Sequence, residues 1–460
     1  MHADENHDLL APEHWLGPSD DGYDGARRVW NAMHDRYPAH IARCRTVAEV
    51  VEALRFAARA GLDVTVRGGG HNVAGTAVDD GTVMIDLSPM RQVTVDRLAR
   101  TARAQGGCLL ADVDAATTPH GLACPSGVVS HTGLGGLALG GGYGWLARTW
   151  GLTCDHIMAA EVVLADGSIV EATEVEHPDL LWALRGGGGN FGIVTRFTLR
   201  LRPVGLVHFH VGVYPLAAAP ATLAAYRDFA QRQPDLLHTV GALKHAGKQE
   251  WIPAHLADGP ALFLSSAWFG DPADGPGQTA GLFRAAKPAG ESVRLLSYAE
   301  LQALSDHSEP HGNRYFTKSC YLHDLPPKAS AEFVVAAAEM PSALSSIDFE
   351  YLRGAIASVP ESESAFPSRA VPYIFTASSQ WTDIRHDPEN IAWPRRSIER
   401  LAPFSTGGAY VNYLQSEKEG RVREVYGAER HGRLAAVKEA YDPDNVLRRN
   451  QNIPPAASGA

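Results

Sequence analysis

VTVRGGGHNVAG, which runs from Val64 to Gly75, is the most informative segment of this sequence: an alternating apolar strand enters three consecutive glycines and then a single histidine, His71. Glycine has no Cβ atom and tolerates positive φ, so this backbone can turn tightly and bring its N–H groups against a bulky anionic ligand. Arg67 adds a fixed positive charge at the same place. Taken alone, the segment is equally compatible with a tight turn beside a structural histidine.

A second glycine cluster is Gly133–Gly144, with the sequence GLGGLALGGGYG. So many glycines in so short a segment predict neither a stable helix nor an ordinary strand. We expect this backbone to lie along an extended ligand, with its N–H groups meeting phosphate oxygens and with the Thr132 hydroxyl adding a contact. A flexible glycine loop is the alternative.

The third cluster, Gly186–Gly192, contains the spacing G-x-G-x-x-G through Gly187, Gly189 and Gly192. In a Rossmann dinucleotide site a strand precedes these glycines and a helix follows them. Here a short predicted helix precedes the glycines and a predicted strand follows. The reversed order argues against an NAD site.

The rest of the chain predicts an α+β fold. A capped amphipathic helix is expected at 46–61, strands of one mixed sheet at 82–87, 92–96 and 101–104, and a hairpin at 161–173 that turns at Asp166-Gly167. After Pro203 the glycine clusters stop, and strands such as 207–214, 262–269 and 347–352 alternate with Ala-rich helical segments. We therefore place a domain boundary near residue 204 and expect the C-terminal segment to dock back on the first domain.

Composition narrows the class of protein. The 460 residues carry a formal net charge of −11 without a basic stripe, which argues against a nucleic-acid partner. The polar N-terminus lacks a signal-peptide pattern and no stretch is apolar enough to span a bilayer, so we expect a cytoplasmic protein with no membrane partner. The five cysteines form no C-x-x-C pair and are expected to be buried free thiols, and Pro310 between His307 and His311 argues against a helical metal site.

Five ordered motifs together identify a family. They are RGGGHN near residue 70, VVSHTGLGGLALGGGYGWLARTWGLTCDH near 140, DLLWALRGGGGNFGIVTRF near 190, YVNY near 411 and YDPDNVLRRNQNI at the end. Over nearly its whole length the chain resembles the FAD-linked oxidases of the vanillyl-alcohol-oxidase type, in their berberine-bridge-enzyme-like branch. Within that branch it is most similar to the polyketide flavoenzymes of the enterocin-pathway type, and more distantly similar to the 6-hydroxy-D-nicotine oxidases.

The resemblance implies a two-domain PCMH-type FAD-binding fold. Residues 1–203 and 406–460 would bind FAD, and residues 204–405 would form a substrate domain whose antiparallel sheet, covered by helices, roofs the flavin ring. It also implies a covalent bond from His71 to the flavin 8α-methyl carbon. Many relatives add a second bond from a cysteine, but Val129 occupies that position here and Cys124 lies on the other side of the turn. We therefore predict a single histidyl link.

The resemblance and the glycine clusters also supply the other residues expected to contact FAD. The pair Asp155-His156 stands where the family usually has Asp-Asn. The expected contacts are Arg67, Gly68, Gly69, Gly70, Asn72, Gly75, Thr132, Gly133, Gly135, Gly136, Gly141, Gly142, Tyr143, Asp155, Gly189, Asn190, Gly192, Ile193, Val194, Asn450 and Asn452.

Catalytic candidates lie near the predicted strand at 347–352. Period-2 alternation places Asp348 and Glu350 on one face, where two carboxylates can raise each other's proton affinity, although a solvated strand face would show the same pattern. The resemblance favours a catalytic role, and we rank Asp348 before Glu350. Tyr410 and Asn412 are expected to share a face near the reactive edge of the flavin, with a core role for Tyr410 left open. His131 is either a flavin or substrate contact or a structural histidine.

The leading hypothesis is an oxidase or oxygenase in which a substrate C–H or alcohol group gives hydride to flavin N5 and O2 takes up the electrons. The expected partners are O2 and a small molecule, with a polyketide or similar natural product favoured and a carrier protein as a candidate for its delivery. The alternative is a small-substrate oxidase that acts on a cyclic amine or sugar alcohol and releases hydrogen peroxide. A non-catalytic flavin-binding protein is the third hypothesis.

Overall fold

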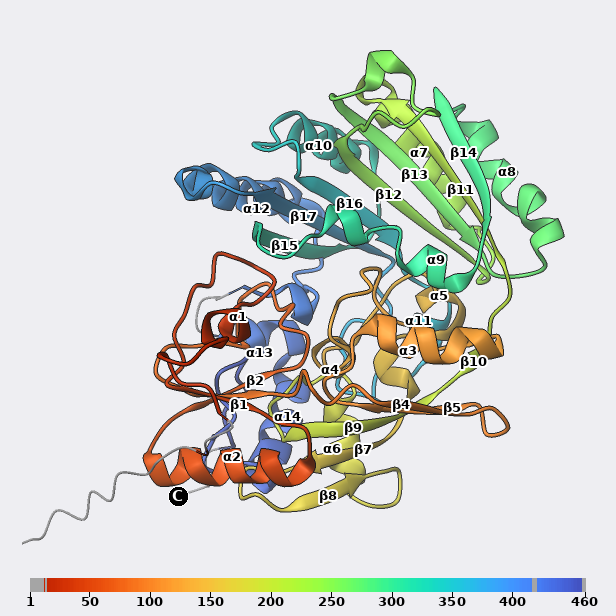
Figure 1. Ribbon diagram of the computed structural model, residues 1–460. Helices are drawn as coiled ribbons and strands as arrows, with labels where there is room; N and C mark the ends of the chain where they lie inside the picture. The colour runs from red at the N-terminus through yellow and green to blue at the C-terminus, as the bar shows by residue number, and fades with distance from the viewer. Residues whose placement is uncertain (1–11, 13–14, 416–419, 457–460) are drawn as a thin grey trace, which may run out of the picture.

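The computed structural model describes residue 12, residues 15–415 and residues 420–456. The N-terminal residues on which the expected absence of a signal peptide depends lie mostly outside this range. No helix in the described part of the chain is long and apolar enough to cross a lipid bilayer. Figure 1 shows two halves, one that holds the N-terminal strands together with the C-terminal helices and one built on a large antiparallel sheet.

The N-terminal half contains two sheets, so the single mixed sheet predicted from sequence is wrong. The parallel sheet has the strand order β1-β3-β2, and helix α2 packs against it. The antiparallel sheet has the strand order β4-β5-β9-β7-β8. The chain leaves the first sheet after β3, where Ser88-Pro89 interrupts the ladder. The parallel sheet and its helices comprise α1 (Tyr23–Arg27), β1 (His40–Arg43), α2 (Val47–Ala60), β2 (Val64–Arg67) and β3 (Val83–Asp86). The antiparallel sheet comprises β4 (Val93–Asp96), β5 (Thr101–Gln105), β7 (Ile157–Val163), β8 (Ile169–Ala172) and β9 (Ile193–Arg200).

Several local predictions in this half are confirmed. Thr46 caps α2 by accepting a hydrogen bond from the Glu49 N–H, and Gly61 ends the helix in the left-handed conformation. Gly167, at φ +81°, makes the turn between β7 and β8. The second glycine cluster is a correction, because residues Leu134–Leu139 form the short helix α4. Tertiary packing outweighs the low helix propensity there, since Leu134 and Leu139 are buried in the core.

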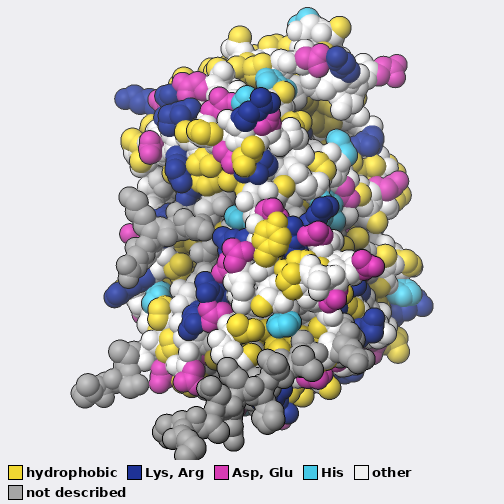
Figure 2. All heavy atoms as spheres, turned by 60° about the vertical axis from the view of Figure 1, so that its left-hand side comes forward, with side chains coloured by type: hydrophobic (Ala, Val, Ile, Leu, Met, Phe, Trp, Pro, Cys, Tyr) yellow, Lys and Arg dark blue, Asp and Glu magenta, His cyan; other side chains and the backbone are white. Residues whose placement is uncertain are grey.

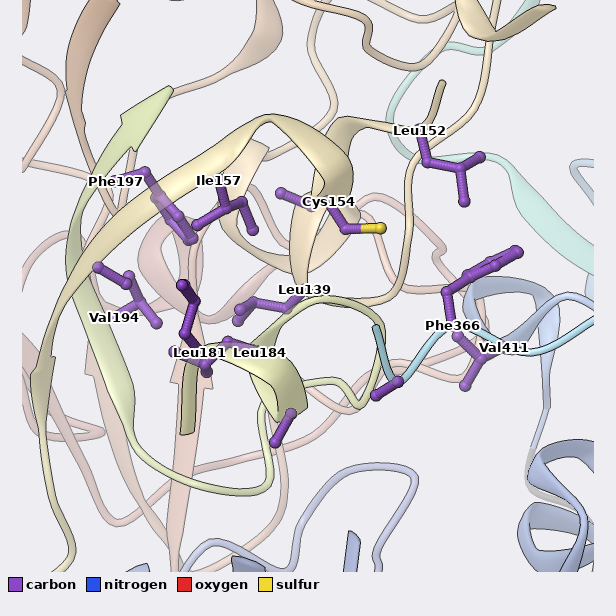
Figure 3. Packing of buried hydrophobic residues seen from close by; sticks show 14 of the residues in the cluster. Leu139, Leu152, Cys154, Ile157, Leu181, Leu184, Val194, Phe197, Phe366 and Val411 are labelled. Carbon is purple, nitrogen blue, oxygen red and sulfur yellow. The ribbon is translucent and has the colours of Figure 1, made fainter. Parts of the chain in front are cut away.

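The core of this half lies between the five-stranded sheet and short helices. Figure 3 shows Leu139, Leu181 and Leu184 meeting Phe197 and Ile157 of the sheet. The core fixes the loops between these elements, and those loops carry the glycine clusters. The short elements are α3 (Leu110–Thr117), β6 (Leu122–Ala123), α4, α5 (Ala147–Trp150), α6 (Pro178–Leu184) and β10 (Arg202–Pro203).

The second half is a seven-stranded antiparallel sheet of order β14-β11-β13-β12-β16-β17-β15. Helices α7, α8, α10 and α12 cover one face of this sheet, and its other face points toward the N-terminal half (Figure 1). The strands are β11 (Val207–Pro215), β12 (Leu237–His245), β13 (Pro260–Trp268), β14 (Gly290–Leu296), β15 (Arg314–Leu322), β16 (Ser346–Tyr351) and β17 (Tyr373–Trp381). The helices are α7 (Ala219–Ala230), α8 (Gly275–Ala285), α9 (Tyr298–Gln302), α10 (Pro327–Ala338), α11 (Ala355–Ser358) and α12 (Asp387–Leu401).

The C-terminal segment packs beside the first half of the chain. It contains helices α13 (Arg421–Tyr426) and α14 (Ala428–Tyr441). Lys438 of α14 is completely buried and donates to the carbonyl oxygens of Asn190, at 2.7 Å, and Leu447, at 3.1 Å. These bonds place the end of the chain beside the third glycine cluster.

Candidate active site

A cavity of about 1300 Å³ lies between the glycine clusters and the open face of the seven-stranded sheet. The sequence candidates that line it come from both halves of the chain. They are Gly68, Gly69, Gly70, His71, Asn72, Thr132, Gly133, Gly135, Gly136, Tyr143, Gly189, Asn190, Gly192, Ile193, Val194, Asp348, Glu350, Tyr410, Asn412 and Asn450.

His71 is held on the cavity wall by aromatic side chains. Its ring stacks on Trp30 at a centroid distance of 4.2 Å, and Tyr315 stacks on Trp30 at 3.7 Å. Burial, together with the neighbouring His131 and His311, lowers the pKa of His71 to about 3. The imidazole is therefore neutral at physiological pH and keeps a nitrogen lone pair that can form a covalent bond.

His131 is not part of the cavity lining. Its Nδ1 lies 3.2 Å from Nε2 of His71, and its ring is 4.9 Å from the ring of His311. The structure thus places His131 beside the histidine predicted to carry the flavin.

The glycines of the three clusters have different roles. A Cβ atom at Gly69 would lie 2.4 Å from the backbone nitrogen of Gly133, so these two clusters pack directly on each other. At Gly136 and Gly189, which both line the cavity, a Cβ atom would meet no protein atom within 4 Å. The open space beside these two residues is available to a ligand.

Gly75, Gly141 and Gly142, which the sequence predicts as cofactor contacts, are not among the described residues that line the cavity. All three have positive φ, and a Cβ atom would clash with His34 at Gly75, with Phe366 at Gly141 and with Thr153 at Gly142. These glycines are needed for packing within the chain.

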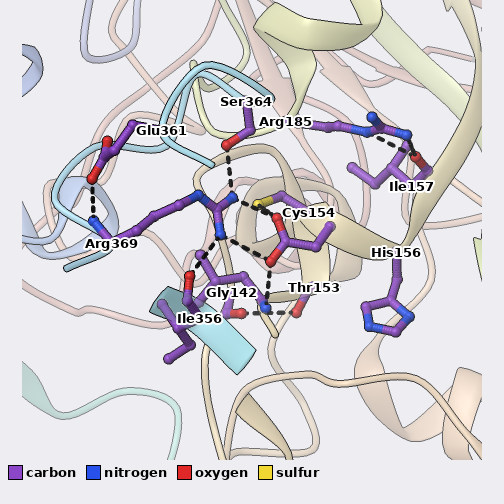
Figure 4. Close-up of polar contacts among 12 residues, drawn as sticks. Gly142, Thr153, Cys154, His156, Ile157, Arg185, Ile356, Glu361, Ser364 and Arg369 are labelled. Carbon is purple, nitrogen blue, oxygen red and sulfur yellow. Dashed lines mark hydrogen bonds and ion pairs between the residues drawn. The ribbon is translucent and has the colours of Figure 1, made fainter. Parts of the chain in front are cut away.

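Asp155, another predicted cofactor contact, is engaged by a side chain of the protein. It does not line the cavity and forms a bidentate ion pair with Arg369, at 2.5 and 3.1 Å. Figure 4 shows Arg369 with its other partners, among them the Ser364 hydroxyl. His156, beside Asp155, bridges the backbone oxygens of Trp150 and Arg200, each at 3.0 Å. Asp155 therefore ties the loop that carries Arg369 to the first half of the chain, while His156 ties its own segment to Trp150 and Arg200 within that half.

Arg67 and Asn452 are also absent from the cavity lining. Arg67 donates to the Ala26 carbonyl oxygen and lies 3.9 Å from the Asp86 carboxylate, so its charge is used within the chain. At the cavity wall, the side chain of Asn190 is likewise engaged: it donates to Gly187 and accepts from the N–H of Ile453.

Strand β16 presents the predicted carboxylates to the cavity. Asp348 and Glu350 line it, whereas Ile347 and Phe349 are buried under the helices on the opposite face. Burial raises the pKa of Asp348; the Ser346 hydroxyl, which donates to this carboxylate at 2.7 Å, works against that rise. The alternation predicted for this strand is confirmed.

The segment YVNY forms a 3₁₀ turn, Val411–Tyr413, and not a strand. Tyr410 and Asn412 nevertheless meet, because the Asn412 side chain donates to the Tyr410 hydroxyl at 2.8 Å. That hydroxyl also accepts the backbone N–H of Gly142 at 2.9 Å. Tyr143 and Tyr413 approach to 3.4 Å between their hydroxyls, so phenols gather at this end of the cavity.

Sequence reasoning missed several groups on or behind the cavity wall, among them Glu309, Lys244 and His238. Burial and the Asp348 carboxylate raise the pKa of Glu309 to about 8, against the lowering effect of Lys244. Glu309 follows a 3₁₀ turn in an irregular segment, and His238 is an isolated histidine in an apolar strand. Neither position carries a sequence pattern that could have revealed it.

The structure fits a bound FAD. Glycine backbone forms the walls at Gly136 and Gly189, and an unpartnered, buried amide oxygen of Asn450 lies at a residue of the cavity lining. Val129 lines the cavity, and no cysteine in the described part of the chain does so. All five cysteines are buried and free, as expected. The cavity is large enough for an extended dinucleotide that is held by main-chain groups.

This fold and cavity define an FAD-linked oxidoreductase. Residues 38–173 match the FAD binding domain family, and residues 409–454 match the family described as berberine and berberine like. The chain is 28% identical to (R)-6-hydroxynicotine oxidase of Paenarthrobacter nicotinovorans, with 96% of each protein covered.

Solved structures agree with this assignment. The crystal structure of 6-hydroxy-D-nicotine oxidase from Arthrobacter nicotinovorans superposes with a TM-score of 0.85 at 25% identity, over 98% of this chain and all of that one. Glucooligosaccharide oxidase from Acremonium strictum, described with a 6-S-cysteinyl, 8α-N1-histidyl FAD, has a TM-score of 0.82 at 25% identity, over 96% and 97% of the two chains. The chain therefore has the two-domain PCMH-type FAD-binding fold predicted from its motifs.

Proposed function

We propose that this protein is an FAD-dependent oxidase whose flavin is attached covalently through His71 alone. The observation that carries the proposal is one cavity with the neutral His71 on its glycine-lined wall and the Asp348 and Glu350 carboxylates on its roof. A bound FAD supplies hydride-accepting chemistry at N5, with O2 as the final electron acceptor.

The covalent link is supported by the surroundings of His71. A neutral imidazole has the lone pair that alkylation needs, and stacking on Trp30 restricts the ring to one orientation. Glucooligosaccharide oxidase is described with both a cysteinyl and a histidyl bond. Here Val129 lines the cavity and Cys124 is buried in the core, which supports a single histidyl bond.

The roof of the cavity provides the proton chemistry. We assign to Asp348 the role of accepting or orienting the substrate proton, because its carboxyl group has a raised pKa and lines the cavity. The phenols of Tyr143, Tyr410 and Tyr413 stand at the same end and can donate hydrogen bonds to substrate oxygen or nitrogen.

We propose a polyketide or similar natural product as the substrate, because the motifs resemble those of the enterocin-pathway type. A carrier protein is a candidate for delivering this substrate, and we propose that the protein acts in the cytoplasm. A small-substrate oxidase that releases hydrogen peroxide is the second candidate. The names of two relatives, which oxidise 6-hydroxynicotine and glucooligosaccharides, favour a cyclic amine or a sugar alcohol.

Two experiments test the proposal. Acid-precipitated protein should stay yellow, and His71→Ala should abolish that retention, whereas Cys124→Ser should retain the flavin. Flavin lost from the Cys124 variant, or retained covalently by the His71 variant, would refute the single link. Mass spectrometry in labelled O2 with aromatic polyketide intermediates, 6-hydroxynicotine and cellobiose then shows which class is oxidised and whether oxygen ends in product or in peroxide.

A further inference from the structure

Behind the roof strand, Glu350 is held by a completely buried histidine. His238, on β12, places its Nε2 at 2.9 Å from Oε2 of Glu350. The two strands are paired so that Val240 lies opposite Glu350, which brings the His238 side chain alongside the carboxylate on the same face. Trp145, a residue of the cavity lining, packs edge-on against the imidazole at 5.8 Å.

Hydrogen bonding specifies the form of this histidine. An ionised carboxylate only accepts, so Nε2 of His238 is the donor. The other ring nitrogen, Nδ1, is buried and has no hydrogen-bond partner among the described residues. A proton on Nδ1 would be an unsatisfied buried donor, which is costly, so the geometry favours the form that carries its proton on Nε2.

The bond fixes one carboxylate oxygen of Glu350 and leaves other acceptor positions of the carboxylate for the cavity. Glu350 is 9% exposed, so its orientation depends on this single side-chain partner. Asp348, two residues earlier, is oriented by Ser346 instead. The two carboxylates of the roof strand are therefore held independently.

We propose that His238 is a positioning residue that aims Glu350 at a hydrogen-bond donor of the substrate, a hydroxyl or ammonium group next to the carbon that is oxidised. This inference rests on the proposed function, since it assumes that the roof of the cavity faces the substrate. It gives Glu350 a role of its own in recognition, separate from the proton chemistry assigned to Asp348.

The same sheet contains a matched control. His210 of β11 bonds Glu291 of β14, also Nε2 to Oε2 at 2.9 Å. Neither residue lines the cavity, and the Glu291 side chain is 53% exposed. A variant of His210 therefore removes an equivalent His–Glu hydrogen bond without touching the site.

The binding experiment uses the holoenzyme and two pairs of probes. Each pair differs in one donor group: cellobiose against methyl β-cellobioside, and protonated 6-hydroxynicotine against its quaternary N-methyl derivative. The wild-type protein should bind the donor member of one pair roughly ten- to a hundredfold more tightly, the range expected for a hydrogen bond to a charged group. His238→Phe should lose that preference, His238→Gln, which restores a side-chain N–H, should recover part of it, and His210→Phe should keep it.

A spectroscopic arm does not depend on any probe. In protein labelled with ¹⁵N at histidine, the His238 signal should show a proton on Nε2, and its chemical shift should change in Glu350→Gln and not in Glu291→Gln. Wild-type protein that binds both members of a pair equally would overturn the proposal, as would an unchanged preference in His238→Phe or a His238 signal that Glu350→Gln leaves unaltered. Failure to load FAD would refute the proposed function instead, so the two failures are distinguishable.

Discussion

Arg369→Met should destabilise the protein without removing its flavin, because the Arg369–Asp155 ion pair joins the two halves of the chain away from the cavity. The Arg369 side chain is 1% exposed and that of Asp155 is 9% exposed. Arg369 also donates to the Ser364 hydroxyl at 2.7 Å and to the Ile356 carbonyl oxygen at 3.4 Å. Removing the guanidinium therefore leaves a buried carboxylate without its main partner.

The expected loss follows from this burial. Breaking a buried, hydrogen-bonded ion pair from one side costs about 3–5 kcal/mol, whereas an exposed pair contributes about 0.2–1 kcal/mol. Arg400→Met provides the control, because Arg400 and Glu339 form an ion pair whose side chains are 33% and 41% exposed. Arg369→Met combined with Asp155→Asn should recover part of the loss, since no unpaired charge remains.

The assay measures unfolding in urea beside the flavin content of the folded protein. Arg369→Met and Asp155→Asn should each unfold at clearly lower urea than Arg400→Met and should still bind one FAD per chain. Asp155→Asn protein that keeps wild-type stability but loses FAD would refute the structural role and restore Asp155 as a cofactor contact.

The remaining predictions concern the cavity wall, the roof strand and the core. Gly136→Val and Gly189→Val should abolish flavin incorporation, because the new side chains would enter open space at the cavity, while circular dichroism should show that both proteins still fold. A normal FAD content in either variant would contradict this. Gly135→Val is a poorer test, because its Cβ would lie 3.0 Å from the Gly106 carbonyl oxygen. Asp348→Asn protein should stay yellow, and its turnover should fall by roughly a hundredfold to ten-thousandfold. In Glu350→Gln protein the rate of proton transfer should fall less than in Asp348→Asn. Burial raises the pKa of Asp114 to about 7. The folded state therefore holds a proton on Asp114 that the unfolded state loses above about pH 4. The free energy of unfolding should consequently fall as the pH rises from about 4 to 7. Asp114→Asn should remove part of that decline in melting temperature, and an unchanged slope would contradict the assignment.

The sequence alone determined the class of fold and the identity of the cofactor. Strand and helix periodicity, capping at Thr46 and the turn at Gly167 are local properties, so the α+β elements could be predicted one at a time. The five ordered motifs carry a resemblance to FAD-linked oxidases, and this resemblance implied an FAD site with His71 and the strand at 347–352 beside it.

Only the tertiary structure decided which residues of those motifs face the ligand. Gly136 borders open space whereas Gly141 makes room for Phe366, yet both are glycines of one cluster, because the difference depends on a loop more than two hundred residues away. Asp155 likewise pairs with Arg369, a residue 214 positions away in the sequence. The register between β12 and β16 brings His238 to Glu350. The pKa of Glu309 depends on its burial and on the charges of Asp348 on β16 and Lys244 on β12. Contacts between distant segments and the burial they create leave no periodicity in the sequence, so these features appear only when the chain is folded.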